Sequence, residues 1–192
     1  MKFNKNLLTT ILTFTLFFIV TSQVSSHMII QRPPGNFRPS GYRPEQRANY
    51  VVPYEKHRTL NDFINTDYYS ITDSARNTWN NGLSEIMIYD GTNTNNSIQA
   101  FDYDNLNVFA FQENQQTNGR IVTMWRIVYN DTKMRHLNRT DQNAVAIHEF
   151  GHTFGLTHVD DPFSIMRHDP TTSGIKVPNT HEFNAVDWIN SN

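Results

Sequence analysis

The decisive stretch of this 192-residue chain reads His148-Glu149-Phe150-Gly151-His152-Thr153-Phe154-Gly155-Leu156-Thr157-His158. Its first part belongs to residues 140–154, whose apolar stripe predicts a helix. On a helix, His148 and His152 lie one turn apart on the same face, so both imidazoles can reach one metal ion. Glycine permits a sharp turn at position 155, and His158 then returns to the same ion as a third ligand.

Three neutral imidazole nitrogens leave one position open on a zinc ion, which is typical of a catalytic rather than a structural site. A water molecule in that position is activated, because zinc lowers its pKa towards about 7. Glu149 lies about 100° round the helix from His148, close enough to take the proton and pass it to a leaving amine. The stretch therefore predicts one catalytic Zn²⁺ and a zinc-dependent endopeptidase, with Glu149 as general base and acid.

The rest of the chain alternates between helical and strand periodicity, which predicts a mixed α+β domain. The metal-binding helix has Thr140 or Asp141 as its cap, and Asn179 with Glu182 makes a capping pair for a closing helix. Helices are expected over residues 67–82, 140–154 and 179–190. Strands are expected over residues 84–90, 106–112 and 121–129, with a polar loop over 90–97 and a polar turn over 113–119.

The N-terminus has the charged, apolar, small-residue order of a secretory signal peptide, predicted over residues 1–26. Its apolar run of about 14 residues is shorter than the roughly 20 needed to span a bilayer, although an uncleaved anchor is the alternative. We expect a secreted, extracellular protein with no stable membrane association after cleavage. Residues 27–50 are rich in Pro and Arg and predict an extended arm or a short pro-segment. Residues 51–192 are assigned to the catalytic domain.

Composition narrows the remaining possibilities. The chain has no Cys, which excludes disulfides, thiolate zinc sites and catalytic thiols. A net charge of −2 argues against a nucleic-acid partner. We expect a protein or peptide substrate and a monomer. Sequons at Asn95, Asn130 and Asn138 matter only if the host glycosylates.

The motif resembles that of the metzincin zinc endopeptidases, and Met166, eight residues after His158, matches the interval of their matrixin branch. The resemblance implies a twisted mixed sheet with an active-site helix and a C-terminal helix. Residues 106–112 are similar to the family's edge strand, along which a substrate lies antiparallel. Met166 would be a hydrophobic floor rather than a ligand, and residues 167–178 the outer wall of the pocket for the residue after the scissile bond. The substrate-binding residues predicted on this edge are Asn107, Val108, Phe109, Ala110 and Phe111.

The chain also departs from the family. Without Cys, a thiol-on-zinc latency switch cannot exist. No His lies between His57 and His136, where animal matrixins have ligands for a second zinc, and a structural calcium is not indicated because the Gly- and Asp-rich loops are absent. His168, two residues after Met166, stands where some metzincins have a Tyr that touches zinc or the transition state. It is either an auxiliary group of this kind or a solvated loop histidine.

Two alternatives stay open. A secreted zinc-binding interaction module without turnover would use the same ligands, but it would not need the proton carrier Glu149. A thermolysin-like site would take a downstream Glu as third ligand, and Glu182 is the obvious candidate. His158 has the better spacing.

Overall fold

The computed structural model describes residues 40–46 and 51–191, which fall within the unit Arg32–Asn192. The predicted signal peptide and residues 27–39 and 47–50 of the predicted arm lie outside the described residues. The described helices are α1 (Tyr68–Asn80), α2 (Asp131–Met134), α3 (Arg139–Thr153) and α4 (Thr180–Ser191). The described strands are β1 (Arg43–Pro44), β2 (Val51–Lys56), β3 (Met87–Asp90), β4 (Ser97–Phe101), β5 (Ala110–Asn118) and β6 (Ile121–Asn130).

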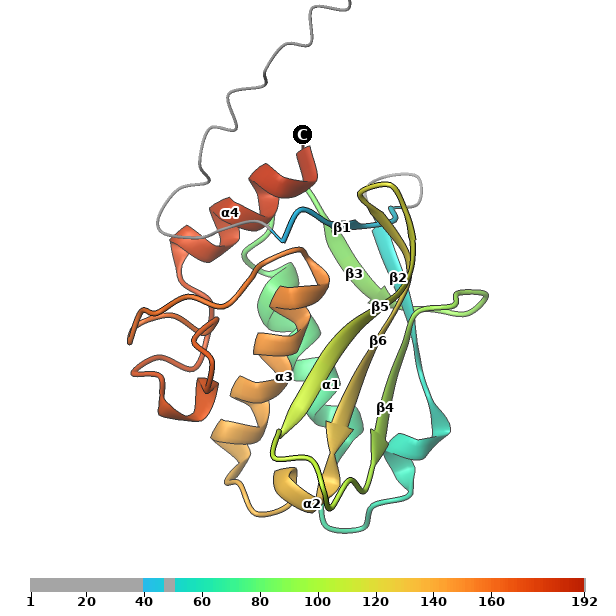
Figure 1. The fold of residues 1–192 in the computed structure, drawn as a ribbon, viewed down its shortest axis with the longest axis vertical. Coiled ribbons are helices and arrows are strands. Elements are labelled where there is room, and N and C mark those ends of the chain that lie inside the picture. The colour runs from blue at the N-terminus through green and yellow to red at the C-terminus, as the bar shows by residue number, and fades with distance from the viewer. Residues whose placement is uncertain (1–39, 47–50, 192) are drawn as a thin grey trace, which may run out of the picture. The chain divides into compact units, whose positions relative to one another are not determined.

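In the described ranges the strands form one mixed sheet in the order β1-β6-β4-β2-β3, with β5 also paired to β6. The β5–β6 pair is antiparallel, whereas the other pairs are parallel. Helices α1 and α3 lie side by side against the sheet, and α4 closes the C-terminal end (Figure 1). The predicted α+β fold class, with an active-site helix and a C-terminal helix, is confirmed.

Aromatic side chains fix α3 in the core, because each buries a large apolar area and packs against rings of other elements. Phe150 of α3 meets the ring of Tyr54 from β2 edge-on, with centroids 5.8 Å apart. Trp79 of α1 packs against Phe154, and its indole N–H donates to the Ile147 carbonyl at 2.8 Å. The helix that carries the metal-binding motif is therefore packed against both the sheet and α1.

The helix boundaries agree closely with the predictions, and the caps explain them. Asn138 rather than Thr140 or Asp141 caps α3, since its side chain accepts a hydrogen bond from the Asp141 backbone N–H at 3.0 Å. The predicted capping pair before α4 is confirmed: the Asn179 N–H donates to Glu182 and the Glu182 N–H donates back to the Asn179 side chain.

The strand predictions need four corrections. The strand expected over 106–112 begins only at Ala110, and the polar turn expected over 113–119 is wrong, because β5 continues to Asn118. Polar residues can occupy this strand because its outer half is exposed and pairs with the long apolar strand β6. The strand expected from residue 84 begins at Met87, and β2 and β4 were not predicted.

Residues 40–46 of the expected arm contact the domain directly. Pro44 and Arg43 pair in parallel with the start of β6. The Ser40 N–H donates to the Gly155 carbonyl at 2.8 Å, and the Gln46 side chain reaches Asn190 of α4 at 3.2 Å. No helix within the described ranges combines the length and hydropathy needed to cross a bilayer.

Candidate metal centre and substrate cleft

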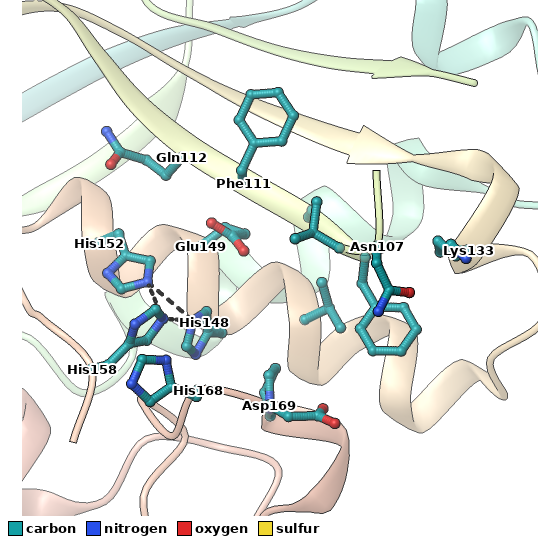
Figure 2. A pocket seen from close by; sticks show the side chains of 15 residues that line it. Asn107, Phe111, Gln112, Lys133, His148, Glu149, His152, His158, His168 and Asp169 are labelled. Carbon is teal, nitrogen blue, oxygen red and sulfur yellow. Dashed lines mark hydrogen bonds between the residues drawn. The ribbon is translucent and has the colours of Figure 1, made fainter. Parts of the chain in front are cut away.

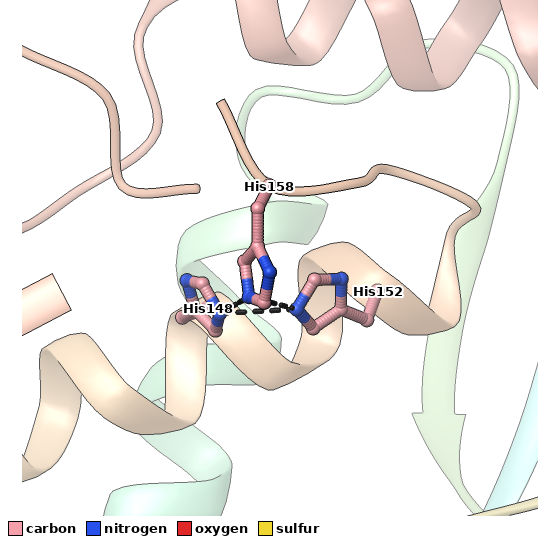
Figure 3. A group of neighbouring side chains, drawn as sticks. All are labelled: His148, His152 and His158. Atoms are coloured by element: carbon pink, nitrogen blue, oxygen red, sulfur yellow. Dashed lines mark hydrogen bonds between the residues drawn. The ribbon is translucent and has the colours of Figure 1, made fainter. Parts of the chain in front are cut away.

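Three imidazoles meet at the C-terminal end of α3 (Figure 3). The Nε2 atom of His148 lies 3.0 Å from that of His152, and each lies 3.1 Å from Nε2 of His158. Gly155 turns the chain between the helix and His158 with a φ of 98°, as its position in the motif predicts. Within the described residues, this is the one group of His, Cys, Asp or Glu side chains arranged to hold a metal ion.

Backbone carbonyls decide which nitrogen of each helical histidine carries the proton. His148 Nδ1 lies 2.8 Å from the Ile165 carbonyl, and His152 Nδ1 lies 2.8 Å from the Leu156 carbonyl. A carbonyl oxygen only accepts, so both Nδ1 atoms are donors, and in the neutral rings both Nε2 atoms carry lone pairs. Two lone pairs that face each other at 3.0 Å repel unless a cation lies between them.

The cluster therefore fits a zinc ion. Nitrogens bound at 2.0–2.1 Å to a tetrahedral zinc are about 3.3–3.4 Å apart, close to the separations found here. Burial lowers the pKa of His148 to about 3, and it also lowers the pKa of His152 and His158. The three rings are thus neutral near pH 7, which is the protonation state that binds metal.

Glu149 lies beside the cluster and faces the cleft from α3 (Figure 2). It is 5% exposed, and its Oε2 atom has no hydrogen-bond partner among the described residues. Burial raises the pKa of this carboxyl to about 8, partly offset by a hydrogen bond from the Gln112 backbone. A buried carboxyl oxygen without a partner is rare, and it suits a group that exchanges protons with a bound molecule.

Met166 lies in the turn that follows the motif, where it is fully buried. Its carbonyl accepts from the Val159 N–H at 3.0 Å, which ties the turn to the residue after His158. The preceding residue, Ile165, supplies the carbonyl that orients His148. The turn therefore positions His148 by a direct hydrogen bond and His158 through its neighbour Val159.

Glu182 supports this turn and is not at the metal centre, so the thermolysin-like alternative is wrong. Its carboxyl is fully buried and accepts from the Ser164 hydroxyl at 2.6 Å, the Met166 N–H at 3.3 Å and the Asn179 N–H at 2.6 Å. Sequence reasoning identified its capping role at α4 but missed its contacts to the turn. Nothing local in the sequence points to those contacts, because the partners lie 16 and 18 residues away.

A cavity of about 490 Å³ extends from the three histidines along β5 (Figure 2). Three residues of the predicted wall, residues 167–178, also line it: His168, Asp169 and Pro170. The His168 ring packs on His158 with centroids 4.1 Å apart. Gln112 and Lys133 also line the cavity and were not predicted. The five residues predicted to bind substrate all line it: Asn107, Val108, Phe109, Ala110 and Phe111.

Asn130 holds the rim of this cavity. It is fully buried, and its side-chain amide donates to the carbonyls of Tyr103, Leu106 and Val108 at 3.0–3.3 Å. Its backbone N–H donates to the Phe109 carbonyl at 2.9 Å. Asn130 thus fixes the loop before β5. Because its side chain is buried and hydrogen-bonded, this sequon has no room for a glycan.

An α+β domain in which two histidines of the central helix and a third beyond its end form one cluster defines a zinc metalloendopeptidase of the metzincin class. A family model described as Peptidase_M10: Matrixin matches residues 60–185, and the chain belongs to the matrixin family. A solved structure described as the GM1 bound form of the ECX AB5 holotoxin is similar over 73% of this chain and 80% of that chain, with a TM-score of 0.51. At 14% identity this likeness concerns the fold alone. No curated protein matches.

Proposed function

We propose that this protein is a secreted endopeptidase in which His148, His152 and His158 hold one zinc ion and Glu149 moves the proton. The unpartnered Oε2 atom of Glu149, buried beside three converging imidazole nitrogens, is the observation that carries the proposal. When bound, zinc supplies Lewis-acid polarisation of the scissile carbonyl and a lowered pKa for water. Glu149 accepts the proton of the attacking water and donates it to the leaving amine.

The proposed substrate is an extended peptide that adds to the edge of β5. Among the described residues β5 pairs with β6 alone, and its first residues line the cleft. An extended peptide can form main-chain hydrogen bonds with such an edge. In the antiparallel direction, the part of the substrate after the scissile bond points from the histidines towards Asn107. Residues Asn107–Phe111 would bind this backbone, and His168 would assist at the open side of His158.

The proposed chain layout is a signal peptide over residues 1–26, an arm over residues 27–50 and the catalytic domain over residues 51–192. The contacts of Ser40 and Gln46 with the domain support retention of residues 40–46 in the mature protein. N-terminal sequencing of the exported protein tests this layout. A mature N-terminus after residue 46 would contradict it.

The substitution Glu149→Gln tests the mechanism, because it keeps the size of the side chain and removes its proton-accepting carboxylate. We expect the variant to bind one equivalent of zinc and to unfold cooperatively, while its cleavage of a mixed peptide library falls at least 100-fold, about the contribution of general acid–base catalysis. Glu55→Gln, at an exposed site outside the cleft, is the matched control and should cleave as the wild type does. Equal cleavage by wild type and Glu149→Gln would overturn the proposal, and zinc binding without any cleavage would favour an interaction module.

A further inference from the structure

The end of the cleft away from the histidines carries a single cation. Lys133, in the last turn of α2, lines the cavity and lies beside Asn107 (Figure 2). It is partly buried, and among the ion pairs within residues 40–46 and 51–191 none involves its ammonium group. Of the described residues that line the cavity, it is the one Lys or Arg.

The charged side chains of the cavity wall near this end already have hydrogen-bond or ion-pair partners. Asp169 also lines the cavity, but its Oδ1 atom accepts from the backbone N–H and the hydroxyl of Thr171, at 2.9 and 2.6 Å. It thereby caps the short 3₁₀ turn Pro170–Thr172. Lys176 of the wall pairs with Asp141 at 2.9 Å. Glu149 lies at the opposite end, beside the histidines (Figure 2).

We propose that Lys133 binds a carboxylate of the substrate on the carboxyl side of the scissile bond. This inference rests on the endopeptidase function and on the antiparallel orientation proposed above, which points that part of the substrate towards Asn107 and Lys133. The carboxylate belongs either to an acidic side chain or to the substrate's own C-terminus. The side-chain amide of Asn107 is a second hydrogen-bond donor at this end (Figure 2).

The surroundings strengthen such a contact. Phe109, Val145 and Pro170 line the same cavity, so a seated peptide excludes water from around the ammonium group. A charge pair is worth more where water is excluded, and an unpaired cation next to a binding site selects partners of opposite charge. Neutral and basic groups at the same substrate position gain no such contact.

The test uses peptides that differ only in charge. One series carries Glu, Gln or Lys at each position after the scissile bond in turn, and a second compares a free C-terminal carboxylate with a C-terminal amide. Zinc-loaded Glu149→Gln protein measures binding without turnover, and wild-type protein measures kcat/KM. We expect the Glu peptide, the free acid or both to exceed the neutral partner roughly fivefold at low salt, and less at high salt.

Substitutions of Lys133 test whether this residue causes the preference for a carboxylate. Lys133→Gln should abolish the preference for the carboxylate, and Lys133→Glu should reverse it in favour of the Lys peptide. Arg58→Gln changes the net charge equally at an exposed site outside the cleft, and it should keep the preference. An equal Glu-to-Gln ratio in wild type and Lys133→Gln, or no ratio at all, overturns the inference. A Lys133-dependent binding preference without any cleavage supports it and sinks the endopeptidase function instead.

Discussion

Gly151 in the metal-binding helix is packed so closely that an added methyl group would collide with the methionine of the following turn. A Cβ at this position would overlap Sδ of Met166, and it would lie 3.1 Å from Cε of Met166 and 3.2 Å from Cζ2 of Trp79. Met166 and Trp79 are both fully buried. The sulfur therefore has no open space to enter, and moving it displaces other core atoms.

Two opposing effects decide the stability of Gly151→Ala. Alanine in a helix interior gains about 1 kcal/mol over glycine, whereas overpacking a core costs about 1–3 kcal/mol. The net result is a free energy of unfolding about 0–2 kcal/mol lower than in wild type. Met166→Ala alone leaves a cavity and costs about 2–5 kcal/mol. In that background the new methyl group meets no sulfur, so the same Gly151→Ala change should stabilise by about 1 kcal/mol.

Urea unfolding of the zinc-loaded wild type, both single variants and the double variant completes a double-mutant cycle. We expect a coupling free energy of about 1–3 kcal/mol in favour of the double variant. Zinc affinity, measured by competition with a chelator, should fall in Gly151→Ala, because the displaced turn also carries the Ile165 carbonyl that orients His148. The reasoning is refuted if Gly151→Ala changes stability by the same amount in both backgrounds.

Gly155→Ala should destabilise the protein about 1–3 kcal/mol more than Gly119→Ala. Both glycines have positive φ, but a Cβ at Gly155 would lie 2.5 Å from the Tyr42 carbonyl oxygen, whereas one at Gly119 meets nothing within 4 Å. Equal losses in urea unfolding would contradict this contact. Glu182→Ala leaves two buried donors and one part-buried donor without their acceptor and should lower the free energy of unfolding by about 2–4 kcal/mol, with weaker zinc binding in a chelator competition. A loss under about 1 kcal/mol would show that water replaces the carboxyl. The chelated protein should lose stability as the pH falls from 6.5 towards 3, because burial lowers the pKa of all three cluster histidines and their contribution is complete only above 6.5. The raised pKa values of the buried carboxyls Glu149 and Glu182 act in the opposite sense, that of Glu149 between pH 4.5 and about 8, but two carboxyls do not outweigh three imidazoles. Unfolding curves that do not change between pH 6.5 and 3 would disprove the assignment.

The metal centre could be predicted from the sequence because its geometry is local. Helical spacing alone places His148 and His152 on one face. The turn at Gly155 then brings His158, three residues later, back to them. The capping pair before α4 was equally predictable, since Asn179 and Glu182 are three residues apart. Such features can be predicted because adjacent backbone angles already bring their residues close together.

The strands that were missed depend on distant partners. β2 contains Pro53 and a charged end, and it is a strand because β3 and β4 pair with it in parallel on both sides. The outer half of β5 is polar throughout, and its antiparallel pairing with β6 decides its conformation. Side-chain pattern describes burial, whereas these strands are fixed by backbone hydrogen bonds to residues far along the chain.

The unpredicted functional residues share this property. Lys133 has no local signature of a binding residue, because only the fold brings the last turn of α2 to the end of the cleft. Asn130 reads as a sequon, yet its burial makes it the support of the cleft rim. Each of them is an ordinary residue whose role comes from its position in the folded chain.

The third ligand also depends on both ends of the domain. At the end of α3, where the chain turns towards His158, the Phe154 carbonyl accepts from the Asn190 side chain at 3.2 Å and the Gly155 carbonyl accepts from the Ser40 N–H at 2.8 Å. The first donor belongs to α4 and the second to the segment before β1. Because His148 and His152 are fixed within the helix while His158 follows this turn, loosening either terminal segment should disturb the third ligand first. The convergence of the lone pairs at the metal centre is therefore a property of the whole domain, although the residues that bind the metal form one short motif.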